Sequence, residues 1–122
     1  MSAEEARFLS IVVSSPSKYI LKLMEQVFCY GTLKDPQEQM ELFGRTVEGI
    51  PDTLKGYATE QISTDGISYP RAVPSASGIL SGMRLALSED ELKKADEHED
   101  PDYKRIQEKL QSGAIAWVYV HP

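Results

Sequence analysis

The sequence predicts one small α+β domain in which several strands form a curled or closed sheet, with two short helices between strands. Two helix-start signals stand at Asp35 and Ser88, each with a glutamate three positions later. Turn-forming residues recur throughout positions 46–87, and the last twenty positions contain two strand-like segments. Short strands that dominate a chain, with helices between them, are typical of an α+β domain.

The first part of this domain has the pattern strand, tight turn, helix. Positions 26–30 are mostly β-branched, aromatic or apolar, which predicts a buried strand that ends at Gly31. Asp35 is a favoured N-cap, a proline follows it, and Glu38 is placed to complete a capping box. We therefore expect a helix over positions 36–43.

Turn signals divide the middle of the chain. Between positions 46 and 87 they fall at Gly49, Pro51, Gly56, Asp65, Gly66, Pro70, Pro74 and Gly78. This spacing favours several short strands, with a hairpin across Asp65 and Gly66.

A second helix and a closing hairpin are predicted for the last third. Ser88 and Glu91 have the spacing of a capping box, which predicts a helix over positions 89–99. Positions 103–111 then alternate in polarity, whereas positions 114–120 are apolar on both faces. We expect these two segments to pair as a hairpin whose second strand is central in the sheet.

Size, charge and cysteine content exclude several classes of protein. A chain of 122 residues can bury one core without disulfides, and the single Cys29 cannot form an internal one. Thirteen Lys and Arg against nineteen Asp and Glu give a net charge of −6, so we expect no nucleic-acid partner. Because no apolar run reaches about 20 residues, we also expect no membrane span.

Residues 1–23 differ in composition from the rest. They contain a possible short helix over positions 2–13 and then a break of serines and a proline. Glu4 and Glu5 stand where a secretory signal would be basic, which favours the cytoplasm. We predict an N-terminal extension of unassigned role over residues 1–23 and the compact domain over residues 24–122.

The turn at Tyr30, Gly31, Thr32 and Leu33 is the first place where chemistry is expected. A glycine between a buried strand and a capped helix lets the backbone approach a ligand closely. It also leaves amide N–H groups that can hold an anion or a developing oxyanion. The alternative is that Gly31 merely permits the turn.

Glu99 is the second place. A step of seven from Leu92 puts this carboxylate on the core-facing stripe of its helix. It also lies at the negative helix end, with Glu97 and Asp100 close in sequence, so we expect its pKa to be raised. A carboxyl group of this kind suits proton transfer at neutral pH. The alternative is a frayed and solvated helix end.

Other reactive residue types give no comparable pattern. Cys29 lies within an apolar strand without a basic neighbour in sequence, which is typical of a small core residue. His98 and His121 have no spacing that resembles a metal site. Trp117 and Tyr119 share one strand face, which indicates core or pocket wall.

Three segments, in order, carry a family resemblance. They are VFCYGTLK at positions 27–34, YPRAVP and GILSG within positions 69–82, and ADEHED and YKR within positions 95–105. Over roughly residues 25–120 the chain resembles the γ-glutamylcyclotransferase-like family, which includes γ-glutamylamine cyclotransferases and AIG2-like proteins. The resemblance implies a small mixed β-barrel with two short helices.

The resemblance also implies a reaction. In this family the α-amine of a γ-glutamyl group attacks its own side-chain carbonyl, which releases an amine and leaves 5-oxoproline. Glu99 would act as general acid and base, and no metal or cofactor is required. The substrate-binding residues implied are Tyr30, Gly31, Thr32, Leu33, Tyr69, Tyr103 and Tyr119.

Three positions depart from the family pattern. Asp100 replaces a glycine, Ala95 replaces a leucine, and Met83 stands where glutamate is usual. These departures motivate an alternative function, a non-catalytic AIG2-like module that binds a γ-glutamyl or carboxylate ligand. The sequence does not choose among γ-glutamyl substrates and does not give the oligomeric state.

Overall fold

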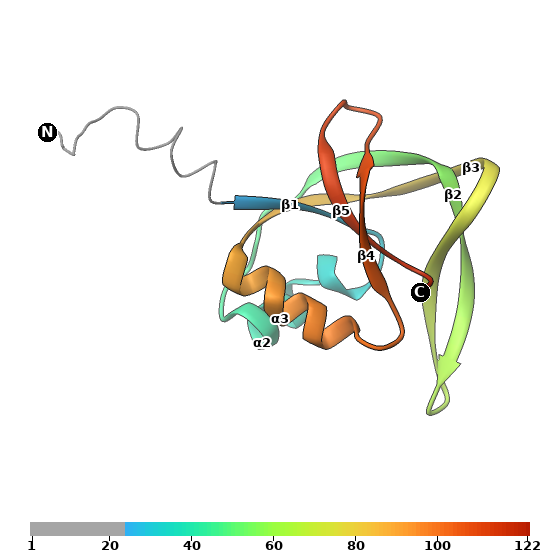
Figure 1. The fold of residues 1–122 in the computed structure, drawn as a ribbon. Coiled ribbons are helices and arrows are strands. Elements are labelled where there is room, and N and C mark those ends of the chain that lie inside the picture. Colours follow the sequence, from blue (N-terminus) through green and yellow to red (C-terminus); the bar gives the residue numbers. More distant parts are fainter. Residues whose placement is uncertain (1–23) are drawn as a thin grey trace, which may run out of the picture.

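A computed structural model describes residues 24–122 (Figure 1). The extension predicted for residues 1–23, with its possible helix over positions 2–13, lies outside the described residues. No helix within residues 24–122 is long and apolar enough to cross a bilayer.

The described chain forms one mixed sheet with two α-helices. In order, the elements are β1 (Met24–Cys29), the 3-10 helix η2 (Thr32–Lys34), α2 (Pro36–Phe43), β2 (Ile50–Thr64), β3 (Ile67–Ser88), α3 (Glu89–Glu99), β4 (Lys104–Lys109) and β5 (Ile115–Val120). The strand order is β2-β3-β1-β5-β4, with β1 and β5 parallel and the other neighbours antiparallel. The α+β prediction is confirmed, and β5 is an inner strand as expected.

The middle of the chain differs from the prediction, because two long strands replace several short ones. The hairpin is as predicted: Asp65 and Gly66 have φ values of 52° and 78°, the left-handed pair that a tight hairpin turn needs. Pro70 and Pro74 do not break β3, which pairs with β2 through this stretch and has few other partners there. We call the ribbon of residues 57–74 the arm, and Figure 1 shows it extending beside the sheet.

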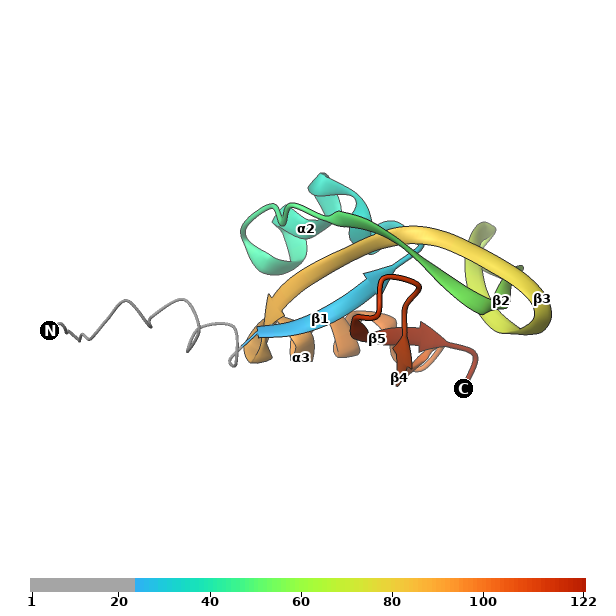
Figure 2. The same cartoon turned by 90° about the horizontal axis from the view of Figure 1, so that it is seen from above.

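The sheet curls until its two edge strands, β2 and β4, lie close to each other. The Tyr57 hydroxyl of β2 donates a hydrogen bond of 2.6 Å to Glu108 of β4. Close by, the backbone N–H of Gln111 donates to the carbonyl of Thr53 at 2.8 Å. No backbone ladder joins β2 and β4 within the described chain, so the curled sheet in Figure 2 is a half-barrel. The two contacts above bridge its edges.

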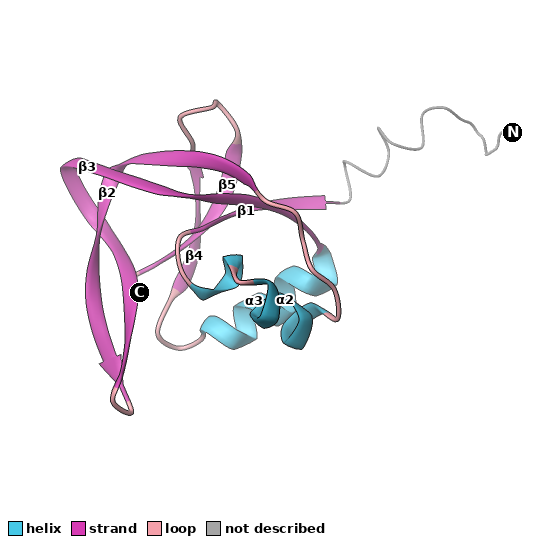
Figure 3. Cartoon of the chain, turned by 180° about the vertical axis from the view of Figure 1, so that it is seen from behind, coloured by secondary structure: helices cyan, strands magenta, loops and turns pink. Residues whose placement is uncertain are grey.

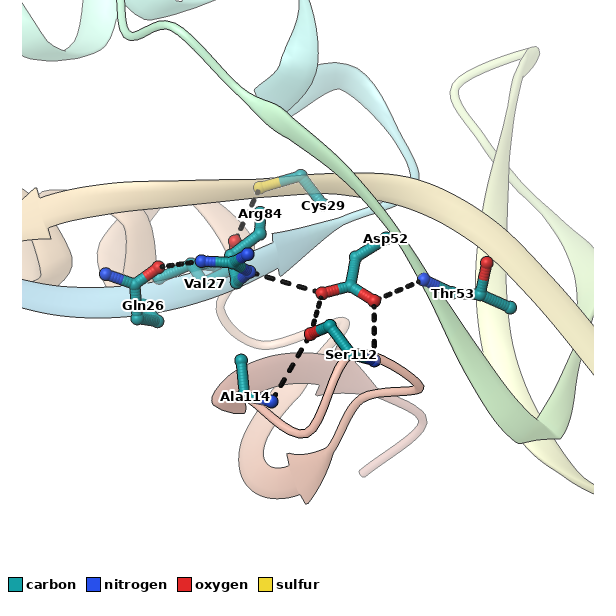
Figure 4. A network of polar contacts seen from close by, with 8 residues as sticks. All are labelled: Gln26, Val27, Cys29, Asp52, Thr53, Arg84, Ser112 and Ala114. Carbon is teal, nitrogen blue, oxygen red and sulfur yellow. Dashed lines mark hydrogen bonds and ion pairs between the residues drawn. The ribbon is translucent and has the colours of Figure 1, made fainter.

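A buried carboxylate strengthens this closure. The Asp52 side chain is 3% exposed and accepts hydrogen bonds from Arg84, the Thr53 N–H, and both the N–H and hydroxyl of Ser112 (Figure 4). Burial raises the pKa of Asp52, but these hydrogen bonds outweigh it and hold the pKa below its usual value. Asp52 therefore ties the turn between β4 and β5 to the start of β2.

Two apolar clusters lie on opposite faces of β1 and β5. Phe28, Leu54 and Val118 belong to the cluster inside the curl. Val27 and Leu92 belong to the cluster between the sheet and the helices, which lie together on one side in Figure 3. Both faces of the two inner strands are thus buried, which accounts for their continuous apolar sequence.

Of the two predicted capping boxes, the one at α3 forms completely and the one at α2 forms only in part. Ser88 and Glu91 form the predicted capping box, and Glu91 also binds Arg45 through both carboxylate oxygens. Asp35 caps α2 as predicted, through the Gln37 N–H. The reciprocal part of that box was wrong, because the Glu38 carboxylate lies 2.7 Å from His98 Nε2 on α3 instead.

Candidate functional site

A pocket of about 200 Å³ lies where the end of β1, the η2 turn, the end of α3 and the arm meet. All eight residues named from the sequence as catalytic or substrate-binding line it: Tyr30, Gly31, Thr32, Leu33, Tyr69, Glu99, Tyr103 and Tyr119. They come from segments far apart in sequence. The curl of the sheet and the packing of α3 bring them together.

Glu99 is the last residue of α3 and is partly buried in this pocket. The helix end is hydrogen-bonded, since the N–H groups of Asp102 and Tyr103 both donate to the Glu99 carbonyl at 3.1 Å. Leu92 and Ala95, on the same stripe, are buried. This geometry rules out the alternative of a frayed and solvated helix end.

Burial is the main cause of an unusual pKa at Glu99. Together with the negative charges of Glu38 and Asp102, it raises the pKa of Glu99 from 4.5 to about 7. The direction of the shift was predicted, but the predicted like charges, Glu97 and Asp100, were the wrong ones. Glu38 comes from α2 and is 61 positions away, which no local pattern indicates.

The turn at residues 30–33 is held in place from behind. The Gln39 side chain, 1% exposed, donates to the Leu33 carbonyl at 2.9 Å and accepts from the Val47 N–H at 2.8 Å. Gly31 precedes η2, so the N–H groups of Thr32 and Leu33 lie in the first helical turn, where they have no partner within the helix. Both residues line the pocket, which makes their amides candidates for holding an acceptor there.

The backbone conformation of the turn does not by itself require a glycine at position 31. Its φ is −126°, outside the left-handed region that demands glycine. A Cβ at this position would approach only Pro70 Cγ, at 3.6 Å, which is an ordinary contact. Because Gly31 and Pro70 both line the pocket, a side chain at position 31 would narrow the pocket without a clash.

Three pocket tyrosines use their hydroxyl groups to hold the walls together. Tyr30 donates to the Tyr119 carbonyl and accepts from the Ala72 N–H at 2.9 Å. Tyr103 donates to the Pro70 carbonyl at 2.6 Å, which fixes the arm at the pocket. Burial raises the pKa of Tyr30, Tyr103 and Tyr119, so all three hydroxyls stay protonated at neutral pH.

Contacts with β4 and β5 fix the orientation of α3. Tyr119 donates its hydroxyl to Asp96 at 2.6 Å, and Arg105 binds both Asp96 carboxylate oxygens at 2.8 and 3.0 Å. The Arg105 guanidinium lies 4.1 Å from the centre of the Trp117 ring. The indole N–H of Trp117 donates a hydrogen bond to the Glu25 carboxylate. Because Asp96 is one turn before Glu99, this network helps to orient the catalytic candidate. Trp117 itself lies outside the pocket lining.

Sequence patterns did not indicate five further lining residues: Phe28, Cys29, Pro70, His98 and Asp102. Cys29 is buried, as expected of a core residue, and burial raises the pKa of its thiol to about 12. His98 directly precedes Glu99 and Asp102 follows it by three positions, and this proximity is the only signal in the sequence. Among residues 24–122, no three His, Cys, Asp or Glu side chains come together as metal ligands would.

The three departures from the family pattern lie outside the pocket lining. Ala95 is fully buried in the cluster beneath the helices. Met83 pairs with Cys29 in the sheet. Its side chain packs against Gly49, where an added Cβ would lie only 3.0 Å from it. Asp100 caps the end of α3 and is exposed.

Comparisons with known proteins agree with the fold and the motifs. The family described as gamma-glutamyl cyclotransferase, AIG2-like, matches residues 27–122. AIG2-like protein C of Arabidopsis thaliana is 30% identical over 106 residues, which cover 79% of this chain and 60% of that protein. The match thus spans less than two thirds of the length of that relative.

Solved structures show the same fold. A solution structure from Arabidopsis thaliana superposes with a TM-score of 0.70 at 28% identity, over 80% of this chain and 62% of that one. A structure described as gamma-glutamyl cyclotransferase superposes with a TM-score of 0.69 at 13% identity, over 81% of this chain and 67% of that one. From its fold, its motifs and the family match, the chain belongs to the gamma-glutamyl cyclotransferase, AIG2-like family.

Proposed function

We propose that this protein is a γ-glutamyl cyclotransferase that converts a γ-glutamyl compound into 5-oxoproline and a free amine. The observation that carries the proposal is Glu99, a partly buried carboxyl group with a pKa of about 7 that lines the same pocket as residues 31–33. A general acid and base works best when its pKa lies near the working pH.

The pocket suits the glutamyl end of such a substrate. Its volume of about 200 Å³ is below the roughly 300 to 1,000 Å³ of pockets for drug-sized ligands, which favours a small group. We propose that the amides of Gly31, Thr32 and Leu33 hold the α-carboxylate or the developing oxyanion. Since the hydroxyls of Tyr30, Tyr103 and Tyr119 are bonded within the protein, these residues would contact the substrate with their rings.

The reaction needs proton transfer more than it needs a nucleophile from the protein. The substrate α-amine and γ-carbonyl belong to one molecule, so holding them in a near-attack shape supplies much of the rate. Glu99 takes one proton from the α-ammonium, and the freed amine bonds to the carbonyl carbon of the γ-glutamyl amide. Glu99 gives that proton to the leaving nitrogen as the old C–N bond breaks. The ring nitrogen loses its second surplus proton to the leaving amine, which departs as an ammonium ion, and no water is consumed.

The test is direct. The purified protein is incubated with γ-glutamyl amines and γ-glutamyl amino acids, and 5-oxoproline is measured. Turnover supports the proposal. The Glu99→Gln variant should keep ligand-dependent thermal stabilisation while losing turnover, because it removes the proton carrier and leaves the amides of residues 31–33 in place. Full turnover by this variant would remove Glu99 from the mechanism.

The second candidate function is a binding module without catalysis. The departures at Asp100 and Met83 motivate it, but neither residue lines the pocket, so they give it little structural support. Thermal stabilisation by γ-glutamyl compounds without 5-oxoproline from any of them would favour this function.

A further inference from the structure

The arm is a two-stranded ribbon with two edges, and its turn determines which backbone groups reach each edge. In a hairpin with a two-residue turn, the residues that flank the turn form a hydrogen-bonded pair, and bonded and non-bonded pairs then alternate. Thr64 and Ile67 flank the turn at Asp65 and Gly66. Within the arm, the even-numbered residues of β2 therefore bond to β3, whereas the odd-numbered residues of β2 direct their N–H and C=O groups away from the ribbon.

The β3 edge of the arm faces the rest of the molecule, and there the even-numbered residues point outward. Pro70 has no N–H, and its carbonyl accepts the hydrogen bond from Tyr103. The Ala72 N–H donates to the Tyr30 hydroxyl at 2.9 Å, and the Ala72 carbonyl accepts from the N–H of His121 at 3.3 Å. The β3 edge of the arm is therefore covered by contacts within the chain.

The β2 edge of the arm has no comparable cover. Nearer the sheet, the turn between β4 and β5 bonds to the Thr53 carbonyl, and Tyr57 contacts β4. Beyond these contacts the arm projects from the molecule (Figure 3). No hydrogen bond within the described chain reaches the outward backbone groups of Thr59, Gln61 or Ser63, and their side chains are exposed and uncharged.

This edge also lacks the features that normally prevent edge strands from pairing. Proteins protect such edges with lysines, prolines or bulges. Positions 58–63 contain no lysine and no proline, and they pair with β3 without a shift in register. Their one charged side chain, Glu60, is bound to Arg71 of the same ribbon. The arm thus has one protected edge and one unprotected edge.

We propose that two copies of this chain associate through the β2 edges of their arms, antiparallel about a two-fold axis at Gln61. Thr59 then bonds to Ser63 of the partner subunit, and Gln61 bonds to Gln61 of the partner subunit. An axis at Glu60 is unfavourable, because it would place the two Glu60 carboxylates opposite each other. This interaction surface is separate from the pocket, and the inference does not depend on the proposed function.

A second copy fits this edge because the assembly closes at two. Pairing uses up both β2 edges and leaves the two β3 edges of the arms on the outside. Those edges are protected by Pro70, Pro74 and the contacts of Ala72, so a third copy finds no edge to join. Because the paired segment is short, the interface is small, and we expect a weak dimer with a Kd of about 10 to 100 μM.

The first test uses the unaltered full chain. In sedimentation equilibrium, the average mass should rise with concentration from that of one chain to that of two, and no further. Over the same concentrations, amide hydrogen exchange should slow at Thr59, Gln61 and Ser63, whereas the Glu60 amide, which faces β3, is protected throughout. A single-chain mass up to about 1 mM would overturn the proposal. So would larger assemblies, or association that leaves these three amides unprotected.

Proline substitution provides a matched pair of variants. Gln61 and Ser68 direct their N–H groups to opposite edges of the ribbon, so a proline at either position spares the bonds between β2 and β3. Both variants lose the same hydrogen bond, from the Ser68 hydroxyl to the Gln61 side chain at 2.9 Å. Gln61→Pro should weaken association at least about 10-fold, and Ser68→Pro should leave it unchanged. Equal effects of the two variants would overturn the proposal.

Charge substitution tests self-pairing without proline. Gln61→Lys and Gln61→Glu should each remain monomeric, because the two-fold axis places like charges opposite each other. An equimolar mixture of the two variants should form the dimer again, since the charges across the axis are then opposite. Dimers of either variant alone, or a mixture that stays monomeric, would overturn the pairing at Gln61.

Discussion

Replacing Glu99 by glutamine should stabilise the protein above pH 4.5, and most strongly at neutral to alkaline pH. The pKa of Glu99 is about 7 in the folded protein and 4.5 ordinarily. At about 1.4 kcal/mol for each pH unit, ionised Glu99 costs the folded state about 3 kcal/mol. The cost is absent below pH 4.5, where the carboxyl is protonated in both states. It grows as the pH rises towards 7, where only the unfolded state ionises readily.

Urea unfolding at two pH values checks this. The gain in free energy of unfolding from Glu99→Gln should be about 2 to 3 kcal/mol larger at pH 8.5 than at pH 5. Glu97→Gln, two positions away on the exposed side of α3, should show no such pH dependence. An equal effect of Glu99→Gln at both pH values would refute the reasoning, because it would mean that Glu99 ionises normally in the folded protein.

Three other substitutions separate binding from stability. Tyr103→Phe removes the bond to Pro70, so KM should rise several-fold while kcat changes little; an unchanged KM would count against a role of the arm in binding. Gly31→Ala should leave the urea midpoint nearly unchanged yet weaken ligand binding in calorimetry, and equal affinity would contradict the narrowed pocket. Asp52→Ala should cost about 3 kcal/mol in urea unfolding at pH 7, because Arg84 loses its buried partner; a cost below 1 kcal/mol would show that the closure is unimportant.

Local signals were sufficient where the partner lies nearby in sequence. The capping box at Ser88 and Glu91 spans three positions, and the hairpin at Asp65 and Gly66 needs only its own two residues. The placement of Glu99 on the buried stripe followed from the phase set by Leu92. In each case the residues that determine the structure are no more than seven positions apart in the sequence.

Where the partner is distant, local signals failed. Glu38 has the right spacing for a capping box, yet its carboxylate contacts His98, because the packing of α2 on α3 brings that imidazole within reach. Pro70 and Pro74 have the composition of breaks, but the arm is a two-stranded ribbon that tolerates a missing N–H on its open side.

The candidate site depends mainly on contacts between residues that are distant in sequence. The sequence could indicate which residues belong together only through the family motifs, since the contacts that hold the pocket join distant segments. The bond from Tyr103 to Pro70 spans 33 positions, and the bond from Tyr30 to Tyr119 spans 89. No periodicity or spacing rule predicts contacts of that separation.

The rate of 5-oxoproline release by Glu99→Gln, measured beside the wild-type protein and Glu97→Gln, tests the central claim most directly. If Glu99 carries the proton, Glu99→Gln should lose at least about 100-fold in kcat at pH 8, while Glu97→Gln keeps the wild-type rate. Equal rates for Glu99→Gln and the wild-type protein would contradict the account, because the buried carboxyl group of the pocket would then have no part in the chemistry.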